Sequence, residues 1–466
     1  MMGKPQCLEP KLFYANLNIA ERVPADHPLR RVASVLDFTF VRSLVAPCYG
    51  HNGHESLDPT VILKLLYLAF AENIRSEREL LRILPCRLDW LWFLNMDLDS
   101  PIPHHSVLSK ARELWGLETF DKIFTHVLAQ CDQAGLIEGR TWHVDSTLLK
   151  GHLAADRRIP RVLWNQLQDA LTPPAPAEAL AAEPPPAPAT PPAAAAEAAL
   201  TPAAPPPRAG RTPVPVQDTQ AALMPLPPTG PVNARWLSAT DPDAAAFTKP
   251  GYGMTVGYKD HRLVDNRHGL IVATLATPAD YDDAGMVPAL LDQADRSTAL
   301  TPHELVGDSM YGTQANYAQL PARGIRPYLK KRRARGEKNR GSWLSHLPVA
   351  CTAGRARALM QRRREVAERS FAVAHARHGH RRCRWRRRWR VQLQCYLVAA
   401  TQNLHILARH RPGPGAKAGQ NPRTMALAGT SAAAPGSRAW VQRPATRLGS
   451  IGSPLTRAAR AWLMRR

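Results

Sequence analysis

The sequence lacks a long apolar run and a cysteine framework, and both absences exclude classes of protein. The longest apolar stretch, VILKLLYLAFA, begins at Val61, is too short to span a bilayer and is interrupted by Lys64. The N-terminus lacks the basic, apolar and small-residue pattern of a secretory signal. The seven cysteines are scattered and contain no CxxC pair, which is typical of a reducing compartment. We therefore expect a soluble, cytoplasmic protein that has no disulfides and no membrane partner.

Acidic residues are scarce in one long stretch of the chain. The whole sequence has 61 Lys and Arg against 38 Asp and Glu, a formal net charge of +23 at pH 7. Residues 321–390 contain 23 Lys and Arg but only three acids, Glu337, Glu365 and Glu368. This excess favours a polyanion as the partner. A solvated, arginine-rich surface without a function is the alternative.

Changes of composition divide the 466 residues into four parts. Residues 1–140 have the apolar periodicity of helices and predict an all-helical N-terminal domain. Residues 171–232 are rich in Pro and Ala, cannot bury enough surface to fold, and predict a disordered insertion. Residues 411–466 lack periodicity and predict a disordered basic tail. The insertion therefore interrupts one domain, made of residues 141–170 and 233–410.

Local signals mark helix ends in the N-terminal part. Asp58 and Pro59 provide an N-cap and a first-turn proline for the helix that follows. Pro85 predicts the end of the next helix, and Gly116 divides two later amphipathic segments. Short helices of this kind can form a helix-turn-helix that binds DNA. Helical packing without any DNA contact is the alternative.

Strand and helix signals alternate around the insertion in the order β-β-β-α-β-α-β-α. The first strand is TWHVDSTLL, and two more, GMTVGYKDHRLVD and GLIVATLAT, are joined by turn residues from Asn266 to Gly269. The strands HELVGDSMYG and IRPYLKKR then alternate with helices, and a basic and an amphipathic helix end the domain. This order predicts an α/β fold with an RNase H-like mixed sheet.

Three acids occupy positions that can converge in such a fold. Asp145 lies on the first strand, Asp308 at the end of the fourth strand, and Glu368 on the helix after the fifth. Converging carboxylates repel one another unless cations lie between them. Their hard oxygen atoms suit Mg²⁺ or Mn²⁺, and two such ions can activate the attacking oxygen and stabilise the leaving oxygen at a phosphodiester. Each acid alone is more readily explained by a turn or a cap, and only the three together point to a metal site. Glu365, three residues before Glu368, could also reach a metal.

Several segments, taken together, resemble a known family. ESLDPTVILKLLYLAFAENIRSERELLRIL and WFLNMDLDSPIPHHSVLSKAR are similar to the N-terminal domain of bacterial transposases in the insertion-sequence-five superfamily. HVDSTLLKGH, VGDSMYGTQANYAQLPARGIRPYLKKR and VAERSFAVAHARHGHRRCRW resemble its DDE catalytic domain, in the same order. The resemblance covers about residues 10–170 and 233–410. It implies that Asp145, Asp308 and Glu368 are the catalytic, metal-binding triad.

The family pattern also describes the neighbours of the glutamate. It places an arginine four residues before it, and Arg364 fits Glu368. It expects a tyrosine and a lysine where this chain has Gln361 and His375. The resemblance implies metal-dependent cleavage at the ends of a mobile DNA element, with two Mg²⁺ or Mn²⁺ ions, and transfer of the freed 3′-hydroxyl into target DNA. A decayed copy that binds DNA without cutting it, and a nuclease that does not join strands, are the alternatives.

The implied partners are double-stranded DNA, as terminal inverted repeats and as target, and further copies of the chain, because two element ends must be paired. No small-molecule substrate is implied, and the expected location is the bacterial cytoplasm, associated with the nucleoid. Residues 381–390 contain seven arginines and two tryptophans, a composition suited to phosphate contacts and base stacking. The candidate DNA-contacting residues are Lys330, Lys331, Arg332, Arg364, Arg369, His375, Arg382, Arg384, Trp385, Arg386 and Arg388.

The sequence also contains candidate ligands for a second metal site. His378, His380, Cys383 and the more distant Cys395 are loosely spaced like zinc ligands. The dense positive charge around them opposes a divalent cation.

Overall fold

The computed structural model describes residues 2–3, 18–50, 55–153, 158–171, 231–249, 253–331 and 353–410. The expected insertion lies outside the described residues, apart from its terminal positions, and the expected tail lies wholly outside them. The described residues belong to one compact unit.

Helices fill the described N-terminal part, as the sequence predicts. In α4 the Asp58 carboxylate accepts the Thr60 N–H at 3.1 Å and Pro59 takes the first turn, so the expected cap is confirmed. Lys64, which interrupts the apolar run, donates its ammonium group to the Phe93 carbonyl at 2.6 Å. The helices are α1 (Ile19–Arg22), α2 (Pro28–Val35), α3 (Phe40–Val45), α4 (Pro59–Ala71), α5 (Glu77–Ile83), α6 (Leu88–Leu94) and α7 (Ser106–Gln133).

The long helix α7 is kinked at Gly116. Its φ of 68° and ψ of 172° are non-helical, and φ lies in a region that favours glycine. The two amphipathic segments expected from the sequence are therefore the two arms of α7. The second arm buries Phe120, Phe124 and Leu128 in the main core.

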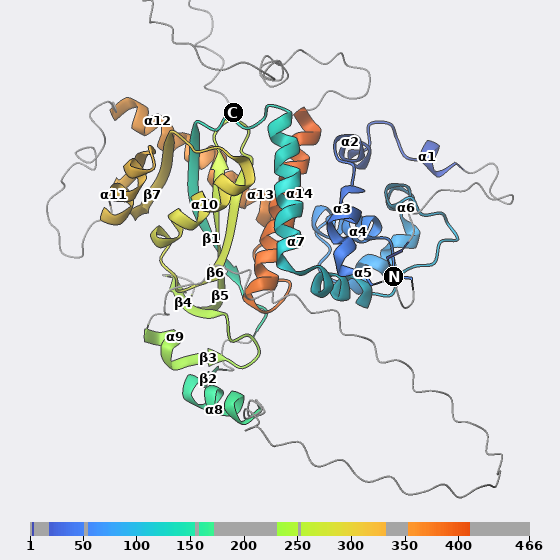
Figure 1. Ribbon diagram of the computed structural model, residues 1–466, viewed down its shortest axis with the longest axis horizontal. Helices are drawn as coiled ribbons and strands as arrows, with labels where there is room; N and C mark the ends of the chain where they lie inside the picture. The colour runs from blue at the N-terminus through green and yellow to red at the C-terminus, as the bar shows by residue number, and fades with distance from the viewer. Residues whose placement is uncertain are drawn as a thin grey trace, which may run out of the picture. The chain divides into compact units, whose positions relative to one another are not determined.

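A mixed sheet occupies the other half of the described chain (Figure 1). Its strand order is β4-β5-β1-β7-β8, with β6 also paired to β5. β5 is antiparallel to β1, β4 and β6, whereas β1, β7 and β8 run parallel. The strands are β1 (Thr141–Lys150), β4 (Ala245–Lys249), β5 (Gly253–Asp265), β6 (Ile271–Pro278), β7 (Glu304–Gly312) and β8 (Arg326–Lys331).

Helices separate the later strands and pack on the sheet. α10 (Val287–Thr298) packs on β6 and α11 (Gln314–Ala322) on β8. A continuous helical stretch follows the strands: α12 (Ala353–Arg363), a π-helical turn η6 (Arg364–Glu368) and α13 (Arg369–Arg377). The sequence predicts one basic helix here, and the π turn is an addition to that prediction.

Glu304, the first residue of β7, anchors the start of α12. Its carboxylate accepts hydrogen bonds from the Thr141 hydroxyl at 2.7 Å and from the Arg355 guanidinium at 2.7 and 2.8 Å. Burial acts to raise the pKa of Glu304, but these two donors outweigh it and leave the pKa below its usual value.

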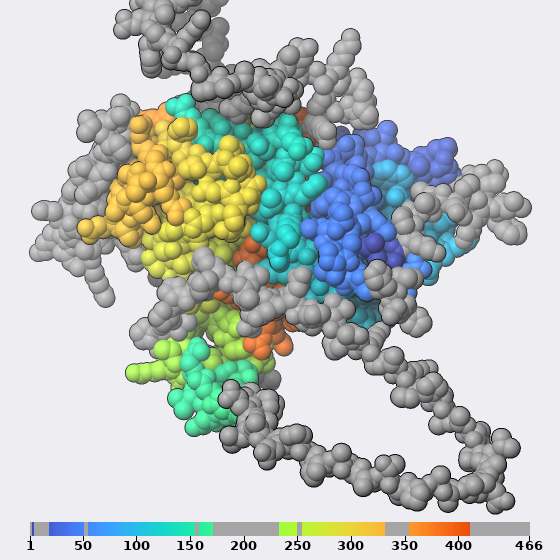
Figure 2. Space-filling view, viewed as in Figure 1, coloured from blue at the N-terminus to red at the C-terminus, as the bar shows by residue number. Residues whose placement is uncertain are grey.

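The last helix, α14 (Arg388–His410), was expected to be amphipathic, and that expectation is wrong. Residues 391–404 are buried on every side, because α14 packs against α7, α2, α4 and β6 at once. α7 and α14 lie side by side in Figure 1, and in Figure 2 α7 is a central band between the sheet region and the N-terminal helices. The main core thus runs without a break from the N-terminal helices to the sheet.

Short elements beside the insertion were not expected. β2 (Arg158–Pro160) pairs with β3 (Trp236–Ser238), and α8 (Arg161–Leu171) and α9 (Pro231–Arg235) flank them. Within the described residues, no helix is both long and apolar enough to cross a membrane. Cys48, Cys86, Cys131, Cys383 and Cys395 are free thiols.

Candidate active site

Parallel pairing of β1 and β7 brings two of the predicted acids together. Thr141, Trp142 and His143 pair with Glu304, Leu305 and Val306, and continuing this register sets Asp145 beside Asp308. Asp308 was expected at a strand end but lies inside β7. Pairing of β7 with β8 is nevertheless interrupted between Gly307 and Gly312, so the ladder is irregular where Asp308 lies.

The third acid reaches the same place from the helix that crosses the sheet. Glu368 is the last residue of the π turn, which contacts both β1 and β5. Such turns insert one extra residue into a helix and occur frequently at functional sites.

One side chain, Arg363, touches all three acids. Its Nη1 lies 2.9 Å from Asp145 Oδ2, and its Nη2 lies 3.8 Å from Asp308 Oδ2 and 3.3 Å from Glu368 Oε1. Because Asp308 and Glu368 share one nitrogen atom, their oxygens are no further apart than these two distances together. The structure therefore brings the three predicted acids into one cluster.

Burial decreases across the cluster from Asp145 to Glu368. The side chains of Asp145, Asp308 and Glu368 are 14, 34 and 50% exposed, and that of Arg363 is 10% exposed. Burial raises the pKa of Asp145 to about 6, and the nearby Asp308 adds to the rise. Arg363 and the Ser146 N–H, which Asp145 Oδ1 accepts at 2.9 Å, oppose it.

The carboxylate oxygens of this cluster are hard ligands of the kind that a divalent cation takes, although those of Asp145, Asp308 and Glu368 do not all lie within 4.8 Å of one another with Arg363 among them. Three carboxylates face a single guanidinium group, so the cluster keeps an excess of negative charge. Arg363 Nε and Nη1 are buried, and Nη1 meets Asp145 Oδ2 as an ion pair at 2.9 Å. Mg²⁺ or Mn²⁺ would take the place of the guanidinium group among these hard carboxylate oxygens.

Glu365, the rival of Glu368, faces elsewhere. It pairs with Arg362 at 2.8 Å, and among the described residues it forms no ion pair with Arg363. Arg363 itself was missed from the sequence, because a regular helix places position i−4, here Arg364, on the face of Glu368. The π turn moves that role to position i−5, and Arg364 is exposed.

The predicted DNA-contacting residues divide by burial. Arg384 and Arg388 are buried, each 9% exposed, and His375 and Trp385 are partly buried. The side chain of Lys331 and the whole of Arg332 lie outside the described residues. The exposed members are Lys330, Arg364, Arg369, Arg382 and Arg386.

The expectation that Arg384 and Arg388 contact DNA is corrected by their burial, whereas Trp385 is only partly buried. Arg384 lies over the Phe70 ring at 4.0 Å and donates to the Ala69 carbonyl at 3.1 Å, which joins the C-terminal stretch to α4. Burial lowers the pKa of Arg384 to about 9. Arg388 donates to the Ala276 carbonyl at 3.1 Å, and Trp385 packs against Phe70. These side chains hold the fold together.

His375, which replaces the lysine of the family pattern, is uncharged at neutral pH. Burial and the neighbouring His380 and Arg381 lower its pKa to about 4. Its Nε2 lies 3.3 Å from the Thr147 hydroxyl. It therefore cannot supply the positive charge of a lysine.

A second cluster of potential metal ligands is fully buried. Asp260, His380 and Cys395 have ligand atoms within 4.8 Å of one another. This cluster contains two of the four zinc-ligand candidates from the sequence, His380 and Cys395, but not His378 or Cys383. Arg262 Nε and His380 Nε2 both lie 2.8 Å from Asp260 Oδ2. The guanidinium already neutralises Asp260, which disfavours a divalent cation.

Comparison with known families agrees with this architecture. Residues 17–114 match the family described as Transposase domain (DUF772), and residues 212–404 match the Transposase DDE domain. The second match contains Asp308 and Glu368 and begins after Asp145, which the insertion separates from it. No curated protein and no solved structure matches the chain.

The match to the Transposase DDE domain covers the strands from β3 to β8 and the helical stretch that carries Glu368. One transposase match lies before the insertion, and the other begins within the insertion and continues beyond it. The chain therefore belongs to the DDE transposases of the insertion-sequence type.

Proposed function

We propose that the chain cuts DNA at the ends of its insertion sequence and transfers the freed 3′-hydroxyl to target DNA. Asp145, Asp308 and Glu368 would hold two Mg²⁺ or Mn²⁺ ions. The single observation that carries the proposal is the contact of Arg363 with all three carboxylates.

An RNase H-like fold is part of the proposal. Three antiparallel strands, β6, β5 and β1, followed by the parallel strands β7 and β8, support it. In this arrangement two acids come from adjacent parallel strands and one from a crossing helix. The strands supply a rigid base, and the helix supplies the third ligand at a partly exposed position.

The mechanism follows from the burial of each acid. Bound divalent ions lower the pKa of an attacking water or hydroxyl and stabilise the charge on the leaving oxygen. Asp145, the most buried acid, is fixed by the Ser146 N–H and would hold its ligand oxygen in place. Glu368 is half-exposed, so its carboxylate borders the surface that the scissile strand would approach. Arg363 would leave the carboxylates when the ions enter, because like charges repel.

DNA binding is assigned to two parts of the chain. We propose that Lys330, Arg364, Arg369, Arg382 and Arg386, which are exposed, contact phosphates and position the strand. Residues 1–140 are proposed as the DNA-binding domain that recognises the terminal inverted repeats, and the sheet domain as the catalytic one. Pairing of two ends implies assembly of several copies on DNA.

One observation favours a second function, that of a decayed copy that binds DNA without cutting it. The neutral His375 lies at the position where the family expects lysine. A lost charge there would weaken strand positioning and leave general binding intact.

Cleavage of DNA that carries the element's own terminal repeats tests the proposal. We expect cleavage in Mg²⁺ or Mn²⁺ and none in a chelator, and loss of at least 100-fold, roughly, for Asp145→Ala, Asp308→Ala or Glu368→Gln. Glu118→Gln, an exposed acid of α7, is the matched control. Glu365→Gln is expected to lose far less than Glu368→Gln, and the reverse order would transfer the metal site to Glu365. DNA binding without cleavage in any metal would establish the decayed copy.

A further inference from the structure

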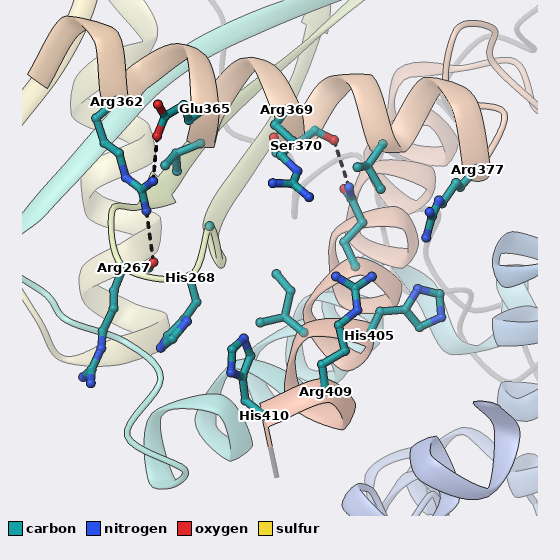
Figure 3. A pocket seen from close by; sticks show the side chains of 15 residues that line it. Arg267, His268, Arg362, Glu365, Arg369, Ser370, Arg377, His405, Arg409 and His410 are labelled. Atoms are coloured by element: carbon teal, nitrogen blue, oxygen red, sulfur yellow. Dashed lines mark hydrogen bonds and ion pairs between the residues drawn. The ribbon is translucent and has the colours of Figure 1, made fainter. Parts of the chain in front are cut away.

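A cationic pocket lies on a different face of the helix that carries Glu368. Its volume is about 460 Å³, and it is lined by the end of α12, the π turn, α13, the β5–β6 turn and the end of α14. Figure 3 shows Arg362, Glu365 and Arg369, from the helical stretch that carries Glu368, around this pocket. Arg267 comes from the β5–β6 turn and Arg409 from α14. The neighbours Arg362 and Arg363 thus serve two sites: Arg363 binds the acids, and Arg362 lines the pocket.

Positive charge in this pocket greatly exceeds negative charge. Five arginines line it, and Glu365, its one acidic lining residue, is already paired with Arg362 at 2.8 Å. Arg369, Arg377 and Arg409 are exposed, and no ion pair within the described part of the chain involves any of them. Like charges around one hollow repel, and an anion in the hollow removes that repulsion.

His268, which lines the pocket, lies in the same positive electrostatic field. Burial, His410 and the nearby arginines Arg267 and Arg362 together lower the pKa of His268. The imidazole and guanidinium groups therefore share one cationic environment, which a bound anion would stabilise.

We propose that this pocket binds the phosphodiester backbone of a DNA strand beside the active site. The inference rests on the proposed function, because the strand is taken to be DNA that the enzyme processes. The pocket would hold the strand by its phosphates and contribute no sequence preference.

The size of the pocket favours a backbone segment over a single inorganic anion. At about 30 Å³ for each water, 460 Å³ is room for roughly fifteen waters, far more than one phosphate displaces. Arg369 and Arg377 lie two helical turns apart on α13, and Arg409 faces them from α14. Guanidinium groups spread in this way match successive phosphates of one strand.

The position of the pocket couples it to catalysis. Arg369 follows Glu368 directly in the chain, at the junction between the π turn and α13. A strand held by Arg369 would therefore fix the segment that carries the third acid.

The test measures DNA affinity against salt concentration, by fluorescence anisotropy on a short random-sequence duplex in a chelator. We expect Arg369→Gln/Arg409→Gln to reduce the slope of log K against log salt by about 1–2, since each lost phosphate contact removes about 0.9. Arg296→Gln/Arg323→Gln, on α10 and directly after α11, removes the same charge outside the pocket and is expected to leave the slope nearly unchanged. Thermal unfolding checks that both proteins fold, and Arg377→Gln alone serves if the first double variant does not.

Equal slopes for the two double variants would overturn the proposal. So would binding of inorganic tripolyphosphate that depends on Arg369 and Arg409 while the DNA slope does not, since the pocket would then hold a small anion. The assay contains no divalent ions and needs no cleavage. An inactive wild-type enzyme would therefore refute the proposed function and leave the result for the pocket intact.

Discussion

Arg363 offers the most informative perturbation of the active site. It is the only basic side chain that contacts all three acids among the described residues, at 2.9, 3.8 and 3.3 Å. Replacing it by glutamine removes this counter-charge and keeps a polar side chain. The metal-free protein should lose stability, because Asp145 stays buried without a cation.

The magnitude follows from the exposure of the partners. Removing one partner of a fully buried ion pair costs about 3–5 kcal/mol. Asp308 and Glu368 are 34 and 50% exposed, so solvent screens their contacts and the Asp145 contact dominates. We expect a loss of about 2 kcal/mol for Arg363→Gln in a chelator. Because Arg363 competes with cations for the same carboxylates, the variant should bind Mn²⁺ roughly 25-fold more tightly, the factor that 2 kcal/mol represents.

Urea unfolding with and without Mn²⁺, together with calorimetric titration of Mn²⁺, measures both effects. Arg362→Gln is the matched control: its partner Glu365 is 55% exposed, so the cost should be below about 1 kcal/mol and metal affinity should not change. If Arg363→Gln matched the wild type in both stability and Mn²⁺ affinity, the reasoning on charge competition would be refuted.

Three further predictions concern the surroundings of the site. Glu304→Gln should destabilise the protein by about 1–3 kcal/mol at pH 7. Because the folded-state pKa of Glu304 is depressed, the stabilisation by Glu304 is present above the unfolded pKa. The difference between variant and wild type in urea unfolding should therefore shrink as pH falls below about 4.5. Arg384→Met should lower the free energy of unfolding by about 2–4 kcal/mol and leave the salt dependence of DNA binding unchanged. Arg382→Gln, at an exposed position, should reduce the slope of log K against log salt by about 0.9. The reverse pattern would restore Arg384 to the DNA surface. His375→Lys should raise metal-dependent cleavage several-fold if strand positioning lacks a charge there, with His375→Gln as the neutral control, and equal rates for the two variants would show that the charge is irrelevant.

Local signals in the sequence predicted the secondary structure well. Asp58 with Pro59, and the turn from Asn266 to Gly269, act through the backbone within a few residues of themselves. Gly116 was also recognised, because its conformation is a property of the residue itself. The short strands β2 and β3 escaped prediction, since three residues are too few to show a period.

The candidate site was predicted in part, and the missing part depends on tertiary structure. Asp145, Asp308 and Glu368 were recognised from strand order and resemblance, and the structure brings them together around Arg363. The role of Arg363 was missed, because one extra residue in the π turn changes which arginine faces the acids.

The arginine-rich stretch shows the limit of composition as a guide. Sequence alone cannot distinguish Arg384, which binds main-chain carbonyls beneath α4, from Arg382, which is exposed. The difference arises from packing between segments more than 300 residues apart in the chain, such as Arg384 and Ile74.

The central claim is tested most directly by a crystal structure of the protein soaked in Mn²⁺, with anomalous scattering used to find the ions. The account predicts anomalous peaks within coordination distance of Asp145, Asp308 and Glu368, with the Arg363 guanidinium displaced from the carboxylates. An Arg363 that still contacts all three acids in saturating Mn²⁺, with no peak beside them, would contradict it.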